Sequence, residues 1–288
     1  MPLLGFNRNS PSATVATSDR FLPTASAHSI ERCAATISFG EEVPEKLFRS
    51  LSEKMAQAAA QAGLKKQPMI GFRFDLSGGN IIHRTEESSE GGPSTFASVD
   101  QSVSLMFVPN QISWSTTRYV RWRPFIGAFE EYFSDVLASV LDVLTPKGIR
   151  LEYLDRFFWG GAWPTFDISH LIKKESGYVL MRALRSRRQW HSHSGWFDKH
   201  QSFRRLTNVN IDVTDAIQGA AGPKPSVGIL TVLQDELNID GYGSTSPDLV
   251  NLKFIFGRFE DLHLGLKNVL SDIIVSDMAT EIGLNSPP

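Results

Sequence analysis

The stretch VSLMFVPNQISWS, residues 103–115, decides the fold class of this 288-residue chain. Val103, Leu105 and Phe107 are apolar and recur at every second position, which is the period of a half-buried strand. The Pro-Asn-Gln sequence at 109–111 is typical of a turn, and the alternation resumes beyond it. The stretch therefore predicts a β-hairpin and an antiparallel sheet.

The clearest helix follows this hairpin. Pro124 suits its first turn, because proline has no N–H to lose there, and Thr145-Pro146 ends it. A second long helix is predicted after Ser246-Pro247-Asp248, and a further apolar face at 47–62 predicts another helix. The apolar face of the clearest helix consists of Phe125, Phe129, Tyr132, Phe133, Val136, Leu137, Val140, Leu141 and Leu144.

Strands are predicted around these helices. They lie at residues 30–39, 69–75, 149–159, about 178–186, 189–197, 203–213 and 226–237. Antiparallel hairpins dominate and no strand–helix alternation runs through the chain, so the pattern favours α+β over α/β. We expect one or two antiparallel sheets with two long amphipathic helices packed on one face.

The order of elements repeats in outline, which raises the hypothesis of a two-fold internal duplication. The segments VSLMFV at 103–108 and VGILTV at 227–232 are predicted to occupy equivalent places. We expect a mobile tail at 1–28, rich in Ser, Thr, Pro and Ala, an N-terminal α+β half at 29–147 and a C-terminal α+β half at 148–288.

The composition excludes several classes of protein. With 29 Lys+Arg against 31 Asp+Glu, the formal net charge is −2, which argues against a wholly basic nucleic-acid protein and against an acidic disordered chain. The single cysteine, Cys33, excludes an intramolecular disulfide. Neither a secretory signal nor an apolar stretch of about 20 residues is apparent. We expect a cytoplasmic protein that does not contact a membrane.

Motifs for catalysis or cofactor binding are absent from the sequence. It contains no phosphate loop, dinucleotide fingerprint, nucleophile elbow or His-Glu-x-x-His pattern. We therefore expect neither catalytic residues nor a cofactor.

Two pairs of polar residues are weaker candidates for chemistry. His191 and His193 would point to the same face of a strand, but a zinc site needs further ligands, so metal binding is a minor hypothesis. Glu152 and Asp155 would face opposite sides of a regular strand. That placement favours a salt bridge or a strand-edge charge over acid–base work.

The segment 181–206 is the most informative for function. It carries seven basic residues and one acid, with aromatic residues between them. Arginine binds phosphate or carboxylate, and aromatic rings stack on bases or pack on a protein partner. The alternative is a solvated hairpin whose aromatic side chains enter the core. The predicted partner-binding residues are Arg185, Arg187, Arg188, Trp190, His191, His193, Trp196, Arg204 and Arg205.

A second basic cluster precedes the central helix. It comprises Arg118, Arg121 and Arg123 with Tyr119 and Trp122. The simplest interpretation is a pre-helix turn in which Trp122 is anchored against the helix.

The chain resembles a sporadically distributed family of uncharacterised bacterial and archaeal proteins. The resemblance covers about residues 30–283 and excludes the tail. It is carried by the hairpin at 103–115, the segment 118–125, IRLEYLDRFFW at 149–159 and FEDLHLGLKNVLSDIIVSDM at 259–278.

Single residues both match and depart from the family pattern. Tyr153, Arg156, Leu262 and His263 match it, whereas Glu152 and Asp155 stand where the family tends to have Arg and Asn. The sporadic distribution implies a horizontally moving cassette, such as a toxin–antitoxin or phage-defence system.

Three functions are open on these grounds. The first is a non-catalytic interaction protein, antitoxin-like or chaperone-like, that binds a protein partner. The second is a nucleic-acid-binding module that uses residues 181–206. The third is a metal-dependent enzyme supported only by His191 and His193. A homo-oligomer is compatible with all three.

Overall fold

The computed structural model describes residues 19–25, 27–67, 69–74, 81–86, 92–217, 222–237 and 251–284. Most of the predicted tail, residues 1–18, lies outside these ranges. The described remainder of that segment contains strand β1 (Phe21–Pro23), and the side chain of Phe21 is buried.

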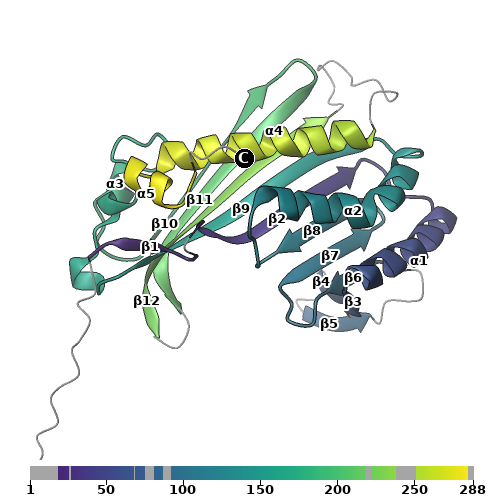
Figure 1. Cartoon of the computed structure of the whole chain (residues 1–288), viewed down its shortest axis with the longest axis horizontal. Coiled ribbons are helices and arrows are strands. Elements are labelled where there is room, and N and C mark those ends of the chain that lie inside the picture. Colours follow the sequence, from purple (N-terminus) through teal and green to yellow (C-terminus); the bar gives the residue numbers. More distant parts are fainter. Residues whose placement is uncertain are drawn as a thin grey trace, which may run out of the picture.

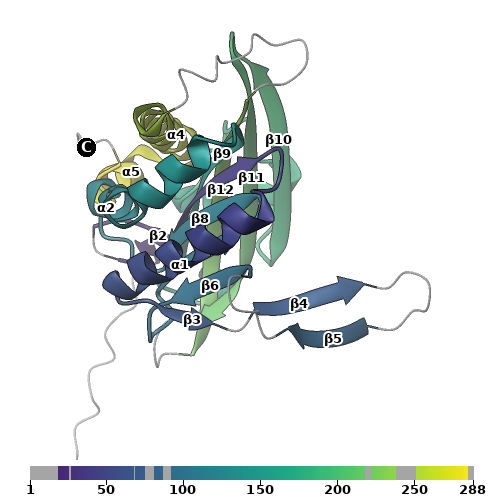
Figure 2. The ribbon, with the colours of Figure 1, turned by 90° about the vertical axis from the view of Figure 1, so that its right-hand side faces the viewer.

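The largest element is a ten-stranded sheet in which all neighbouring strands are antiparallel (Figure 1). β1 pairs with one end of β9, off the main path. A separate pair, β4 (Met69–Phe74) and β5 (Ile81–Glu86), extends away from the sheet in Figure 2. The main path runs through β10 (Trp190–Lys199), β11 (Phe203–Ile217), β12 (Pro223–Leu237), β9 (Pro146–Trp159), β2 (Ile30–Phe39), β8 (Gln111–Thr116), β7 (Val103–Val108), β6 (Ser94–Ala97) and β3 (Lys65–Gln67).

The hairpin predicted from residues 103–115 is confirmed as β7 and β8. Leu105 lies opposite Trp114 and Phe107 lies opposite Ile112. All four of these side chains are buried, because the two-residue period places them on the face of the sheet that the helices cover.

The prediction of two long helices packed on one face is wrong. In the described part of the chain three helices have seven or more residues, and they flank the sheet (Figure 2): α1 (Glu45–Gln61), α2 (Trp122–Leu141) and α4 (Leu252–Ile273). α1 corresponds to the helix predicted at 47–62, which the expected pair of packed helices leaves out. Its buried side chains Phe48, Leu51 and Met55 join those of α2 in the same apolar core, so α1 belongs to the helices that flank the sheet.

Two further expectations are also corrected. The segments 103–108 and 227–232 do not occupy equivalent places: the second lies in β12 beside β9, whereas the first forms β7, separated from β2 by β8. The strand predicted at 178–186 is absent, and α3 (Met181–Leu184) lies there instead. Leu180 and Met181 are 75% and 53% exposed, so the apolar run that suggests a strand is not a buried one.

Two apolar cores lie between the sheet and its helices. The first joins α1, α2 and the first half of α4 to strands β2, β7, β8 and β9. The second joins the end of α4 and α5 (Ser276–Glu281) to β11, β12 and the end of β9. α4 crosses from one core to the other: Leu266 belongs to the first and Leu270 to the second.

No helix among the described residues is both long enough and apolar enough to cross a membrane.

Candidate functional site

The predicted partner-binding arginines fall into two groups in the structure. Arg185, Arg187 and Arg188 are exposed in the turn between α3 and β10. Arg204 and Arg205 lie on β11, where carboxylates of the neighbouring strand β12 neutralise them. Arg204 donates to Glu236 at 2.6 Å and Arg205 donates to Asp235 at 2.6 Å.

The aromatic and histidine residues of the same segment alternate along β10. Trp190 and Trp196 face the helix side and pack against the second core, while His191 and His193 are exposed on the other side. His191 Nδ1 lies 2.6 Å from an Asp212 carboxylate oxygen.

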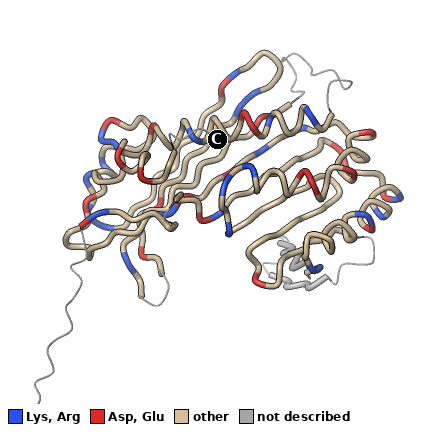
Figure 3. Tube along the Cα trace, in the orientation of Figure 1, with Lys and Arg blue, Asp and Glu red and all other residues tan. Residues whose placement is uncertain are grey.

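The predicted residues do not form one basic-aromatic surface, because the exposed arginines lie in a turn and the tryptophans face the helices. Figure 3 shows basic positions interspersed with acidic ones over the fold. Among the described residues, no three His, Cys, Asp or Glu side chains are grouped as a metal site requires.

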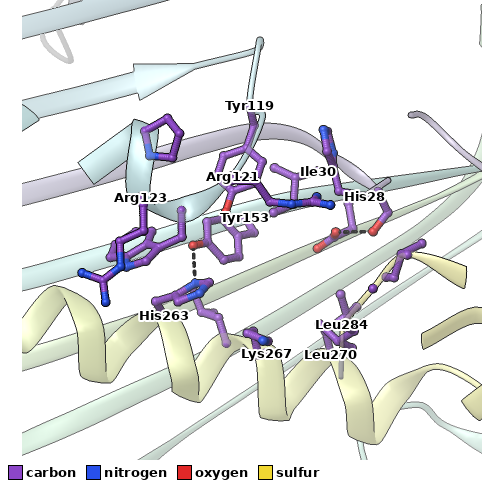
Figure 4. A pocket seen from close by; sticks show the side chains of 17 residues that line it. His28, Ile30, Tyr119, Arg121, Arg123, Tyr153, His263, Lys267, Leu270 and Leu284 are labelled. Carbon is purple, nitrogen blue, oxygen red and sulfur yellow. Dashed lines mark hydrogen bonds between the residues drawn. The ribbon is translucent and has the colours of Figure 1, made fainter. Parts of the chain in front are cut away.

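A cavity of about 450 Å³ lies elsewhere, at the junction of the two cores (Figure 4). Its walls come from the residues before β2, the start of α2, strand β9, the middle of α4 and the turn after α5. On β9 the alternation places Tyr153 and Asp155 on this side of the sheet, whereas Glu152 faces the other side and bonds Arg150. The expectation that Glu152 and Asp155 face opposite sides is confirmed.

Asp155 is a buried polar residue of the cavity. Its side chain is 1% exposed, and its Oδ1 accepts a 2.6 Å hydrogen bond from the Ser29 hydroxyl. The pairing of β2 with β9 has a register shift between Ile30 and Arg32, directly after Ser29. Its Oδ2 is buried and has no hydrogen-bond partner among the described residues. Burial raises the pKa of Asp155 from 3.8 to about 7, since a low dielectric disfavours the charged form.

The structure does not place Asp155 in the salt bridge or at the strand edge that the sequence favours. The sequence favours a salt bridge or strand-edge charge for this carboxylate, but the cation next to it in the chain, Arg156, pairs with Glu31 at 3.0 Å. The signal that points to a buried position is the alternation itself: Asp155 shares a strand face with buried Tyr153 and Phe157.

A hydrogen-bonded tyrosine–histidine pair stands beside Asp155. The Tyr153 hydroxyl lies 2.8 Å from His263 Nδ1, and the imidazole stacks on the Trp122 indole at 4.5 Å between ring centroids. Burial, with the nearby charges of Lys267 and Arg123, lowers the pKa of His263 to about 4. The imidazole is therefore neutral at pH 7 and, with its proton on Nε2, accepts the bond from Tyr153.

Tyr119 completes the aromatic wall. Its ring lies 5.8 Å from that of Tyr153, and burial raises the pKa of both phenols. Both hydroxyls thus remain protonated. Trp122 Nε1 is buried without a hydrogen-bond partner among the described residues.

Basic residues line the opening of this cavity. Arg121 and Arg123 come from the start of α2 and Lys267 from α4. An Arg121 N–H donates to the Ala27 carbonyl at 2.9 Å, and Arg123 pairs with Glu260 at 3.2 Å. Of the lining residues, Asp155 is the one carboxylic acid.

The cavity brings together residues that the sequence alone does not assign to one site. The sequence places Tyr119, Arg121 and Trp122 in a pre-helix turn, and it marks Tyr153 and His263 only as family-pattern positions. Their shared location follows from the pairing of β9 into the sheet and the docking of α4 on β9.

Comparison with known proteins adds no relative. No protein-family model matches the chain, and no curated protein matches it significantly.

Proposed function

We propose that the protein is a non-catalytic binding protein that takes a small molecule in the cavity at the core junction. The observation that carries this proposal is the combination of a 450 Å³ cavity with the buried, partly unpaired carboxyl group of Asp155. Ligand pockets typically measure about 300–1,000 Å³ and combine an apolar lining with a few polar groups that fix orientation.

The lining matches that description. Ile30, Leu266, Leu270 and Leu284 supply apolar surface, and the polar groups converge from β9 and α2. A buried polar group without a partner costs about 1–3 kcal/mol. A ligand atom that bonds Asp155 Oδ2 would remove that cost and would be favoured over a purely apolar occupant.

A neutral hydrophobic fluorophore, N-phenyl-1-naphthylamine, tests this proposal. The wild type should bind it saturably at one site. Leu284→Trp narrows the cavity and should weaken binding about tenfold, which corresponds to about 1.4 kcal/mol. Leu264→Trp is the matched control, because Leu264 is on α4 but 48% exposed. Absence of saturable binding, or equal loss in both variants, would overturn the proposal.

A second candidate, a protein partner on the β10 edge, is favoured by the sheet topology. β10 is the end strand of the sheet and pairs only with β11 among the described residues. An edge strand of ten residues presents backbone donors and acceptors to a further strand. The adjacent Arg185, Arg187 and Arg188 favour an acidic partner, such as another product of the accessory cassette that the family resemblance implies.

A charge-reversal experiment tests this second candidate. In co-expression with the products of neighbouring genes, Arg187→Glu with Arg188→Glu should abolish a complex that Arg49→Glu leaves intact. The nucleic-acid alternative has less support, because Arg204 and Arg205 are already paired with carboxylates. We propose the cytoplasm as the location, since the single cysteine, Cys33, is buried and unpaired.

A further inference from the structure

We propose that the ligand of this cavity is an organic monoanion: an aromatic or aliphatic body that carries one carboxylate or sulfonate group. This inference rests on the proposed binding function and adds the chemical class of the ligand.

The charges around the cavity favour an anionic ligand. Three cationic side chains line it, and they come from two separate elements, α2 and α4. The single lining carboxyl group is Asp155, whose burial favours the neutral form, so that this form predominates below about pH 7. Arg123 is paired with Glu260, whereas the Arg121 guanidinium donates to a neutral backbone carbonyl, so Arg121 is the cation that makes the wall positive toward an occupant. Figure 4 shows Arg121 directed across the cavity toward the side that holds His28.

The start of α2 contributes in the same direction. This 20-residue helix begins at the cavity with Trp122, and no side chain among the described residues caps its first turn by a hydrogen bond. Pro124 has no N–H and the Phe125 N–H donates to the Arg121 carbonyl, so it is the helix dipole that makes this end favourable for an anion. Together with the arginines on either side of Trp122, it forms an anion-binding rim above an apolar interior.

The apolar interior of the cavity suits the uncharged body of the ligand. Leu266 and Leu270 from α4 and Tyr153 from β9 line the space, so the body of the ligand would lie against aliphatic and aromatic surface. In its protonated form Asp155 can donate a hydrogen bond, whereas the Tyr153 hydroxyl already donates its proton to His263. The Asp155 donor favours an oxygen acceptor, such as a carboxylate, over a further donor.

An amine ligand is the contrary case. Asp155 could serve as counter-ion for an ammonium group, but that group would then face Arg121, Arg123 and Lys267. The same-sign charges would oppose it, and an ionised Asp155 would have to remain buried. The structure thus favours the anion.

Two probes with the same ring system test the proposal: 1-anilinonaphthalene-8-sulfonate, an anion, and neutral N-phenyl-1-naphthylamine. The wild type should bind the sulfonate at least about tenfold more tightly. Arg121→Gln should reduce that preference severalfold while the affinity for the neutral probe stays constant. Arg118→Gln is the matched control, because Arg118 pairs with Asp100 at the surface and does not line the cavity.

A third measurement compares 1-naphthylacetate with 1-naphthylmethylamine as competitors for the bound probe. The acetate should displace it at the lower concentration. Three results would overturn the anion proposal while leaving the binding function intact. The wild type could bind the two fluorophores with equal affinity, Arg121→Gln could lose the same affinity for both, or the amine could compete more strongly than the acetate. If neither fluorophore binds saturably, the binding function itself fails.

Discussion

The Tyr153 hydroxyl lies 2.8 Å from Nδ1 of His263, although 110 positions separate the two residues in the sequence. This bond ties strand β9 to helix α4 at the point where the two apolar cores meet. It also sets one wall of the cavity, because the His263 imidazole stacks in turn on Trp122 at the start of α2. The cavity thus depends on three elements that are distant in sequence.

The bond between these two residues should contribute to stability. Tyr153→Phe removes the hydroxyl and leaves Nδ1 of a buried histidine unpaired, so we expect a loss of about 1–3 kcal/mol in the free energy of unfolding. Urea denaturation measures it. Tyr132→Phe, on the half-exposed side of α2, is the control and should change stability by less than about 0.5 kcal/mol. Equal effects would show that the bond contributes nothing.

Asp155 should make the stability of the protein depend on pH. Its pKa is about 7 in the folded protein, against an ordinary value of 3.8 that applies to the unfolded chain. Between these values the folded state holds a proton that the unfolded state has lost, so stability falls as pH rises from about 4 to 7. At about 1.4 kcal/mol per pKa unit, the full effect is on the order of 4 kcal/mol.

Two variants isolate this contribution. Asp155→Asn cannot ionise, so its unfolding free energy should fall less steeply over this pH range. Ser29→Ala removes the donor that favours the ionised form, so the decline should continue to higher pH. Parallel pH profiles for the wild type and Asp155→Asn would contradict the assignment.

A structural role is predicted for Arg205, which the sequence places among the partner-binding residues. Asp235 is fully buried and accepts hydrogen bonds from both Arg205 and Arg258. Asp235→Asn leaves the partly buried Arg205 guanidinium without its counter-ion and leaves Arg258 with Asp261 alone, and we expect a loss of about 3–5 kcal/mol. Thermal or urea unfolding measures it, with exposed Asp212→Asn as the control. A loss below about 1 kcal/mol would return Arg205 to the set of surface residues open to a partner.

The exposed arginines should behave differently. Arg187 and Arg188 are exposed, and surface substitutions of this kind usually change stability by less than about 0.5 kcal/mol. Reversal of both charges should therefore leave urea unfolding unchanged while it affects any complex at the β10 edge. A large destabilisation would indicate that the turn between α3 and β10 has contacts that its exposure does not suggest.

The sequence predicts local structure better than the arrangement of elements. The two-residue period at 103–115 and the 3.6-residue period after Pro124 depend on which side chains face the core, so both hairpin and helix can be read directly. The helix at 47–62 is likewise predicted and forms as α1, but its packing beside α2 over the sheet is not, because that contact depends on the tertiary arrangement. The segment near Met181 shows that an apolar run need not be buried.

The candidate site cannot be predicted in the same way. The spacing of charges in 181–206 is visible in a sequence, but the pairing of Arg204 and Arg205 with β12 depends on strand register. Likewise, nothing local connects Asp155 with Ser29, since a distant strand start brings the hydroxyl to the carboxyl group. The sequence feature that could indicate such a site is a polar residue on an otherwise apolar strand face, as Asp155 is on β9.

The measurement that tests the central claim most directly is a crystal structure of the protein soaked with 1-naphthylacetate. We predict electron density in the cavity at the core junction, with the carboxylate within hydrogen-bond distance of Arg121 and the ring against Leu266. A ligand bound elsewhere, or an empty cavity at a concentration that saturates binding in solution, would contradict the proposal.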